Sequence, residues 1–297
     1  MDFNAAIKIS TGTATSSFLN LNSITTAPTV GTPFSGYVTE RVSYSNAGIS
    51  GFVDSLAQRD GAEADIALLG QRQTQIIVQV YGSSSADFYD KLDAINSALQ
   101  PYPSFATSDD GFRSLDFTQA TNGSAYSSTG IPMRLKVRPQ GIPSYSLDND
   151  FTTPRTTDRG ISTKVAIGLV SKDPRKICQT AITGSFSSAT TSATLTNNGN
   201  YKAYPTFTIV STSAQTIAIS TPLWTTSIAT GAGTTTTVVN AYTRTVTVGG
   251  SLNMAKLNST TTEFPYLQPG GTVVTITPSV GWSSITSLTY SFQEAWL

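Results

Sequence analysis

The charged residues of this chain are distributed unevenly, and their distribution divides the sequence in two. Residues 1–176 contain 15 Lys/Arg and 16 Asp/Glu, whereas residues 177–297 contain five charged residues and 44 Ser/Thr. These five are Lys202, Arg244, Lys256, Glu263 and Glu294. A shift of this size predicts two modules, and we expect domains at 1–176 and 177–297. Because threonine is β-branched and suits a pleated surface, the second module is expected to consist of strands.

The chain of 297 residues contains no histidine and one cysteine, Cys178. The absence of histidine excludes a Ser-His-Asp triad and a Cys-His pair, and it removes a ligand of the usual zinc and non-haem iron sites. A single cysteine cannot form a disulfide within the chain. We therefore predict a protein that is not an enzyme and that needs no cofactor or metal.

Two groups of carboxylates could still carry chemistry. Asp148 and Asp150 offer oxygen ligands for Ca²⁺, but the Gly and Glu spacing of an EF-hand does not follow them, and a solvated loop is preferred. Asp109, Asp110 and Asp116 could supply a glycosidase pair, but no feature of the sequence raises the pKa of one of them. Turn chemistry is the preferred interpretation.

Charge and hydropathy also restrict the partners. The densest basic run, Arg134, Lys136 and Arg138, alternates along one strand face, which favours a solvated face over a nucleic-acid site. There is no apolar run of 18 residues, so we expect no membrane span. The first residues, Met1–Asn4, lack the basic and apolar regions of a secretory signal, and none is expected.

The first module combines strand patterns with one helix pattern. The predicted strands are Ala6–Ser10, Gly36–Tyr44, Gln73–Tyr81, Ser114–Thr118, Ile131–Arg138 and Gly160–Ser171. Polar loops are predicted at 58–65 and 139–158.

The predicted helix follows Ser84 or Ser85, either of which can cap it, and ends before Pro101. Its apolar residues recur with helical spacing and form one stripe, made of Phe88, Leu92, Ile95 and Leu99. Such a stripe requires an apolar surface, which the flanking strands can provide.

The second module alternates almost throughout. Strands are expected at Tyr204–Ile209, Ala214–Ser220, Thr235–Asn240, Thr243–Val248, Gly271–Thr277 and Leu288–Glu294. Turn signals separate them at 197–199, 231–233, 249–250 and 269–271. Short strands with regular turns are typical of a sandwich or a barrel.

The order of these patterns resembles the proteins of siphophage tails. In the first module, residues 59–61 (RDG), the strand within 71–82 and the helix within 87–96 resemble the tail-tube-like module of distal tail proteins. In the second module, the hairpin pattern at 238–250 and the turn and strand at 263–276 resemble the galectin-like sandwich of that family. The last strand, ending at 294–297, and residues 204–209 fit the same pattern.

The resemblance implies a mainly β fold with two β-sandwich domains, the first tail-tube-like with one flanking helix and the second galectin-like. It implies a structural virion protein that forms a hexameric ring at the distal end of the tail tube. The ring would link the tube to the baseplate or tail tip and let DNA pass through its lumen. The alternatives are a tail tube protein with an appended sandwich domain and a carbohydrate-binding module.

The implied partners are other copies in a homo-hexamer, the tail tube protein, a baseplate hub or tail-tip protein, and adhesins or side fibres. Sequence-specific nucleic-acid binding and membrane insertion are not implied. The implied location is the distal tail of the virion, after assembly in the host cytoplasm.

The resemblance also suggests interface residues. Arg59, Asp60, Glu63 and Asp65 lie in one polar loop, and Arg72 begins the next strand. These five are predicted to contact a neighbouring copy in the ring or to line its lumen, and the alternative for the loop is a solvated hairpin tip.

Two further predictions concern the second module. Arg244, on an otherwise uncharged hairpin, is a candidate contact for adhesins, although an exposed cross-strand residue is the preferred interpretation. Trp224, Tyr242, Trp282 and Trp296 could form a sugar-stacking platform, but packing in the core and rim of the sandwich is preferred for them.

Overall fold

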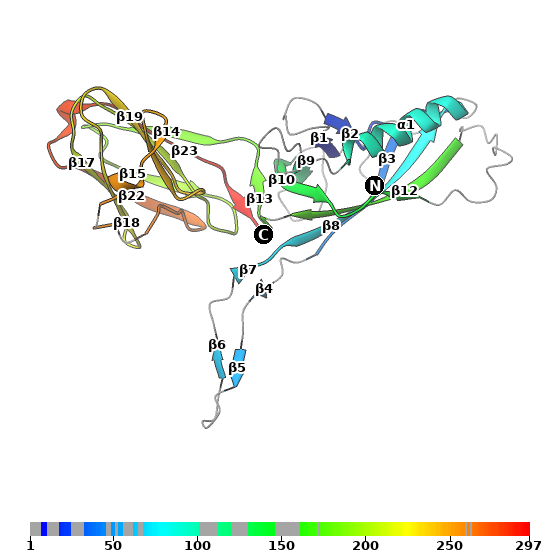
Figure 1. Cartoon of the computed structure of the whole chain (residues 1–297), viewed down its shortest axis with the longest axis horizontal. Coiled ribbons are helices and arrows are strands. Elements are labelled where there is room, and N and C mark those ends of the chain that lie inside the picture. Colours follow the sequence, from blue (N-terminus) through cyan, green and yellow to red (C-terminus); the bar gives the residue numbers. More distant parts are fainter. Residues whose placement is uncertain are drawn as a thin grey trace. The chain divides into compact units, whose positions relative to one another are not determined.

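The computed structural model divides the chain at the point where the charge density falls. It describes residues 7–10, 18–24, 33–45, 49–50, 53–55, 62–64, 68–100, 112–119, 130–145, 161–171, 173–258, 260–261 and 263–297. Two compact units are formed by Met1–Lys176 (unit 1) and Ile177–Leu297 (unit 2). Both consist mainly of antiparallel strands, so the predicted mainly β fold is confirmed (Figure 1).

Unit 1 is organised around antiparallel strands in the order β2-β1-β9-β10-β12-β8-β3, with β11 also paired to β12. The strands are β1 (Ile7–Ser10), β2 (Phe18–Asn20), β3 (Gly36–Tyr44), β8 (Arg72–Gly82), β9 (Arg113–Gln119), β10 (Ile131–Pro139), β11 (Ser144–Tyr145) and β12 (Ile161–Ser171). All six strands predicted for this module are present.

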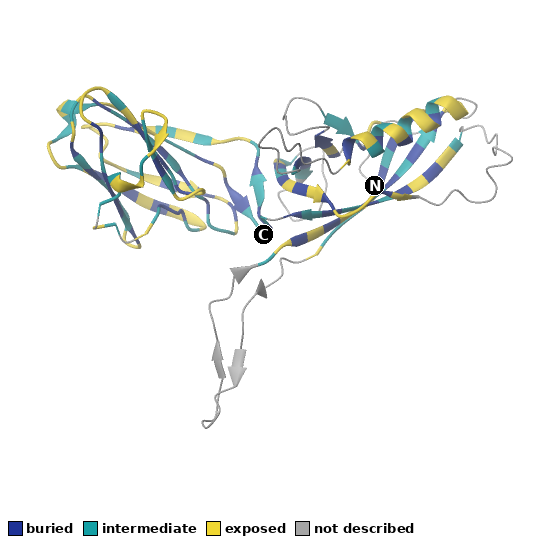
Figure 2. Ribbon diagram, viewed as in Figure 1, coloured by how far each residue is buried: buried dark blue, intermediate teal, exposed yellow. Residues whose placement is uncertain are grey.

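The longest pairing of unit 1 joins β8 to β12, with Gly82 opposite Ile161 and Arg72 opposite Ser171. Buried residues alternate with more exposed ones along both strands, as the two-residue repeat of a strand requires (Figure 2). The buried face of β8 carries Ile76, Val78 and Val80, each fully buried. This alternation fixes the register, because a slip of one residue would expose the apolar side chains.

The helix α1 (Ser85–Ala98) lies over this sheet and confirms the prediction. Ser84 is its N-cap, and the Ser84 hydroxyl accepts a hydrogen bond of 3.2 Å from the backbone N–H of Asp87. The predicted stripe is buried: Phe88, Leu92, Ile95 and Leu99 are each at most 4% exposed. A side chain at Gly82 would place its Cβ 2.4 Å from the Cβ of Phe88, so the helix requires glycine at this position.

The edge strand β3 is held by the segment before it and by the helix. The backbone N–H of Tyr37 donates to the Ser23 hydroxyl at 2.9 Å, and the N–H of Thr39 donates to the Asn22 side-chain oxygen at 3.3 Å. The Tyr37 hydroxyl donates to the backbone oxygen of Lys91 in α1 at 2.9 Å. Burial raises the pKa of Tyr37 to about 12, with a smaller contribution from the charge of Asp87.

Two predicted loops need correction. The interval 58–65 contains a strand, β6 (Ala62–Ala64), which pairs with β5 (Val53–Ser55). Next to it, β4 (Ile49–Ser50) pairs with β7 (Leu68–Leu69). The polar composition around Gly61 suggested a loop, but cross-strand pairing overrides such local signals. The interval 139–158 contains β11, and its residues 146–158 lie outside the described part.

Unit 2 contains two antiparallel sheets, with strand orders β14-β23-β16-β19-β20-β21 and β15-β22-β17-β18. The strands are β14 (Ile182–Phe186), β15 (Ser192–Asn197), β16 (Thr206–Ser211), β17 (Thr216–Ser220), β18 (Thr225–Ala229), β19 (Thr235–Asn240), β20 (Thr245–Val248), β21 (Ser251–Leu252), β22 (Gly270–Pro278) and β23 (Ile285–Phe292). Short strands β13 (Lys176–Cys178) and β24 (Ala295–Trp296) and the 3-10 turns η2 (Met254–Lys256) and η3 (Trp282–Ser284) complete the described elements.

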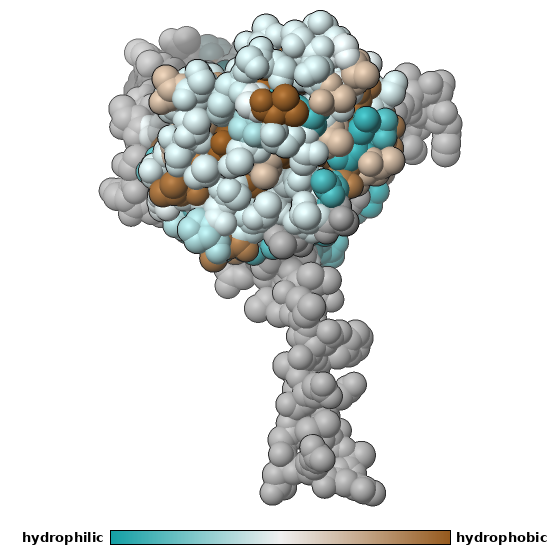
Figure 3. Space-filling model, turned by 90° about the vertical axis from the view of Figure 1, so that its left-hand side faces the viewer, coloured by the Kyte–Doolittle hydropathy of each residue, from teal (hydrophilic) through white to brown (hydrophobic). Residues whose placement is uncertain are grey.

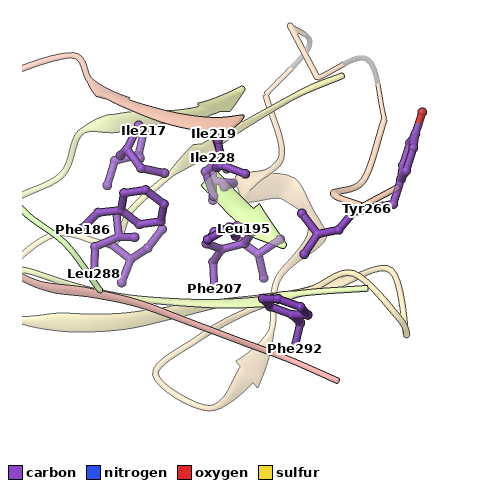
Figure 4. Packing of buried hydrophobic residues seen from close by; sticks show 14 of the residues in the cluster. Phe186, Leu195, Phe207, Ile217, Ile219, Ile228, Tyr266, Leu288 and Phe292 are labelled. Carbon is purple, nitrogen blue, oxygen red and sulfur yellow. The ribbon is translucent and has the colours of Figure 1, made fainter. Parts of the chain in front are cut away.

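One apolar cluster joins the two sheets into a sandwich. Phe207, Ile209 and Leu288 extend from the first sheet, and Ile217 and Ile276 extend from the second. Figure 4 shows buried side chains from both layers converging in the space between them. The predicted β-sandwich is therefore present in this unit.

A polar network fixes the turn between β15 and β16. The buried side chain of Asn197 donates to the backbone oxygen of Tyr201 at 2.7 Å and accepts from the N–H of Gly199 at 3.1 Å. The carboxylate of Glu294 accepts from the backbone N–H of Asn198 at 3.2 Å. A Cβ at Gly199 would lie 1.9 Å from the backbone oxygen of Ala295, so this turn requires glycine.

Candidate interaction surfaces

The predicted ring loop is described only in part. Arg59, Asp60 and Asp65 lie outside the described residues. The backbone of Glu63 pairs with that of Asp54, across β6 and β5, and its side chain is not described. The predicted role of this loop therefore stays a prediction.

Arg72 is described, and it lies inside unit 1. It begins β8 on the same face as Ile76 and Val78 and is 4% exposed. Its Nε has no hydrogen-bond partner, and no ion pair of the described residues includes it. Burial lowers the pKa of the Arg72 guanidinium, and burial together with the Arg72 charge lowers the pKa of Lys176. A buried cation of this kind destabilises a fold unless another group compensates for it.

Asp116 stabilises the sheet of unit 1. It lies opposite Arg134, and the Asp116 carboxylate accepts hydrogen bonds of 2.7 Å from both Nε and Nη2 of Arg134. This bidentate geometry occupies both carboxylate oxygens. Asp109 and Asp110, the other members of the considered glycosidase group, lie outside the described residues.

The described residues contain no group of three or more His, Cys, Asp or Glu side chains that could hold a metal ion. Asp148 and Asp150 are outside this part of the chain. Cys178 is a buried free thiol whose pKa is raised by burial. Within the described ranges, no helix is long and apolar enough to cross a membrane.

The four aromatic residues considered as a platform have different environments. Trp224 is 2% exposed, and its indole N–H donates to the backbone oxygen of Tyr266 at 2.7 Å, so it belongs to the core. Trp282 is half-buried and packs against that core, and Trp296 is half-buried. Tyr242 is 58% exposed and contacts Tyr204, with 6.4 Å between the ring centroids. The preferred interpretation, core and rim packing, is confirmed for Trp224 and Trp282.

Arg244 lies in the turn between β19 and β20 and is exposed. The Asn240 side chain organises this turn, because its oxygen accepts from the backbone N–H groups of Tyr242 at 3.0 Å and Thr243 at 3.1 Å. Arg244 has a φ of 54°, the left-handed conformation that usually favours glycine. This conformation could not be predicted from the sequence, because the left-handed region does not favour arginine.

The outer face of the larger sheet of unit 2 carries mainly hydroxyl groups and no charge. Its residues alternate with buried or partly buried ones along five strands. They are Thr183, Ser185, Thr206, Thr208, Val210, Thr236, Val238, Asn240, Thr245, Thr247, Ser287, Thr289 and Ser291. Figure 3 shows the surface of unit 2 as mostly pale, the colour of near-neutral hydropathy, with few strongly hydrophilic side chains.

The comparisons with known proteins concern the fold. No protein-family model and no curated protein matches the sequence. A search of solved structures matches SPP1 Dit (gp 19.1), described as a paradigm of the hub adsorption apparatus in phages that infect Gram-positive bacteria. The TM-score is 0.58 at 16% identity, over 88% of this chain and 94% of that chain. This chain has the fold of SPP1 Dit.

Weaker matches are found in the baseplate of phage p2 in its activated conformation, in structures with Ca and with Sr. Their TM-scores are 0.45 and 0.44 at 7% identity, over 98% of each chain.

Proposed function

We propose that this chain is a structural protein of a long-tailed phage virion, with the role of a distal tail protein. In this role six copies form a ring at the end of the tail tube, link the tube to the baseplate or tail tip, and leave a lumen through which DNA passes. Unit 1 is the tail-tube-like, ring-forming domain and unit 2 is the galectin-like outer domain. The observation that carries the proposal is the fold shared with SPP1 Dit along nearly the whole of both chains.

The distribution of charge supports this division of roles. A closed ring needs two complementary surfaces on each copy. Unit 1 has 15 basic and 16 acidic residues, a balanced mixture that suits contacts between copies better than attachment to DNA. Unit 2 has five charged residues and a hydroxyl-rich outer face.

The loop that contains Arg59, Asp60, Glu63 and Asp65 is the proposed contact between neighbouring copies. Arg72 is buried within one chain, so in this proposal it supports the base of that loop instead of contacting the next copy. The remaining proposed partners are the tail tube protein, a baseplate hub or tail-tip protein, and adhesins or side fibres. The proposal includes no catalysis, no cofactor and no recognition of a nucleic-acid sequence.

The test is the mass of the purified protein in solution, combined with negative-stain images. One chain is 31.3 kDa, so six copies come to about 188 kDa. A discrete ring with a central hole is expected. Long tubes would support the alternative of a tail tube protein with an appended sandwich. A monomer that binds glycans would support the carbohydrate-binding alternative.

A further inference from the structure

One end of the unit 2 sandwich gathers tyrosines and cations on its surface. We define the tyrosine–cation patch as Lys202, Tyr204, Tyr242 and Arg244; Tyr266, which Lys202 contacts, is 9% exposed and belongs to the core cluster. The Lys202 ammonium lies 4.3 Å from the ring centroid of Tyr266, a cation–π contact. The ring of Tyr204 contacts that of Tyr242, with 6.4 Å between the centroids.

These two contacts are adjacent. Lys202 and Tyr204 flank Ala203, which is fully buried and exchanges backbone hydrogen bonds of 3.0 and 2.8 Å with Leu267. Because side chains alternate along an extended segment, Lys202 and Tyr204 lie on the same side of it, and both are half-buried. The contact of Lys202 with Tyr266 and the contact of Tyr204 with Tyr242 are therefore made from one short segment.

Arg244 has a strained backbone conformation and a charge that no ion pair of the described residues neutralises. It is the one non-glycine residue with positive φ in the described part of the chain, and it lies in the same turn as Tyr242. Elsewhere in unit 2, glycine occupies such conformations, as at Gly249 and Gly250. A strained residue kept where glycine would fit better is a reason to look for a function of its side chain.

The charges of the patch have one sign. No ion pair among the described residues includes Lys202 or Arg244. Tyr242 presents a ring that is 58% exposed in the same turn as Arg244. Exposed tyrosine and arginine side chains are the types most enriched where proteins bind one another, and the guanidinium fork matches a carboxylate in two hydrogen bonds.

We propose that the tyrosine–cation patch binds a carboxylate-bearing protein segment. Arg244 pairs with the carboxylate, and Tyr242 packs against apolar residues of the same segment. The assignment of this segment to another tail protein rests on the proposed function. Binding at the patch itself does not depend on ring formation. A protein segment is favoured over an acidic glycan because the tyrosine rings are tilted by 51° and form no flat stacking platform.

The test uses the full chain and fluorescence anisotropy with a labelled peptide of alternating Glu and Leu. The matched probes are a peptide with Gln in place of Glu, and polygalacturonate as an anionic glycan. Arg244→Gly removes the guanidinium and also relieves the positive φ. Lys164→Gln is the control, because it also removes one positive charge, at a lysine of unit 1 whose side chain is 62% exposed.

The Glu peptide is expected to bind wild type, to lose affinity as salt is raised, and to bind Arg244→Gly about tenfold more weakly. Lys164→Gln is expected to bind like wild type, and the Gln peptide is expected not to bind. Thermal unfolding of Arg244→Gly at or above the wild-type temperature would show that the lost affinity does not come from a damaged fold.

Equal binding by wild type and Arg244→Gly would overturn the proposal, as would equal losses in Arg244→Gly and Lys164→Gln. Arg244-dependent binding of polygalacturonate that exceeds peptide binding would also overturn it, in favour of an acidic glycan site. If the protein forms rings but does not bind the Glu peptide, the binding role of the patch is wrong and the proposed function stands. If the Glu peptide binds through Arg244 but no rings form, the binding role of the patch stands and ring formation is wrong.

Discussion

Units 1 and 2 use polar residues in opposite ways. Unit 1 includes charged groups in its packed structure: Arg72 and Arg113 are buried, and Asp116 pairs with Arg134 between neighbouring strands. In unit 2 the strands from β14 to β23 contain no charged residue. Neutral side chains such as those of Thr226 and Trp224 donate hydrogen bonds to backbone oxygens there. Ionic interactions depend on pH and salt, whereas neutral hydrogen bonds and apolar packing depend on them much less. The stability of unit 1 should therefore respond to solution conditions more than that of unit 2.

The largest effect is expected in the core of unit 2. Phe207 is fully buried in the apolar cluster, so Phe207→Ala should lower the free energy of unfolding of this unit by about 3–5 kcal/mol. Urea denaturation followed by tryptophan fluorescence measures this change, because all three tryptophans are in unit 2. Leu252→Ala, at a side chain that is 65% exposed, is the control and should change stability little. Equal losses in the two variants would contradict the assignment of the core.

The next effect sharpens the contrast in pH dependence. The folded-state pKa of Tyr37 is about 12, above an unfolded value near 10. The contribution of the buried phenol to the stability of unit 1 is therefore complete below about pH 10, and it is lost as the pH rises through 12. A shift of this size corresponds to about 2–3 kcal/mol of unit 1 stability.

Denaturation at pH 8 and pH 11.5 should show a smaller loss on raising the pH for Tyr37→Phe than for wild type. Tyr89→Phe is the matched control, because Tyr89 is 51% exposed on the same helix that Tyr37 contacts. Identical pH profiles for wild type and Tyr37→Phe would count against a buried phenol at this position.

A smaller effect is expected from the ion pair of unit 1. Asp116→Asn leaves the Arg134 guanidinium without its carboxylate and should destabilise unit 1 by about 1–3 kcal/mol. The destabilisation relative to wild type should shrink as salt is raised, since salt screens the lost interaction. Asp90→Asn, on the exposed face of α1, serves as the control. A loss that is independent of salt would mean that Asp116 acts through packing.

The smallest effect has the opposite sign. Arg244→Gly should stabilise unit 2 by about 1 kcal/mol, because glycine adopts the φ of 54° without steric strain. Differential scanning calorimetry can detect this as a small rise in the unfolding temperature of unit 2. A fall in that temperature would show that the arginine side chain stabilises the turn.

The predictable features were those with a local cause. The cap at Ser84 and the apolar stripe from Phe88 to Leu99 both come from neighbouring residues, and they correctly predicted α1. The two-residue repeat correctly predicted β3 and β8 for the same reason. The strand β6 was missed because its pairing with β5 outweighs the polar composition of a short segment.

The candidate site was less predictable because it forms through space. Tyr204 and Tyr242 are far apart in the sequence and meet only when β16 pairs with β19. The positive φ of Arg244 depends on the turn that Asn240 caps, not on the preference of arginine. The burial of Arg72, by contrast, could have been found, since the alternation of β8 places it on the face of Ile76.

The hydroxyl-rich face of unit 2 has a consequence for how such a protein can change over generations. Along its five strands, the inward residues are buried or partly buried and determine the fold, while the residues between them face outwards. Exposed substitutions usually change stability by less than about 0.5 kcal/mol. Selection can therefore alter the outward positions almost independently of the buried ones, and this surface can diversify toward new partners while the sandwich beneath it is inherited unchanged.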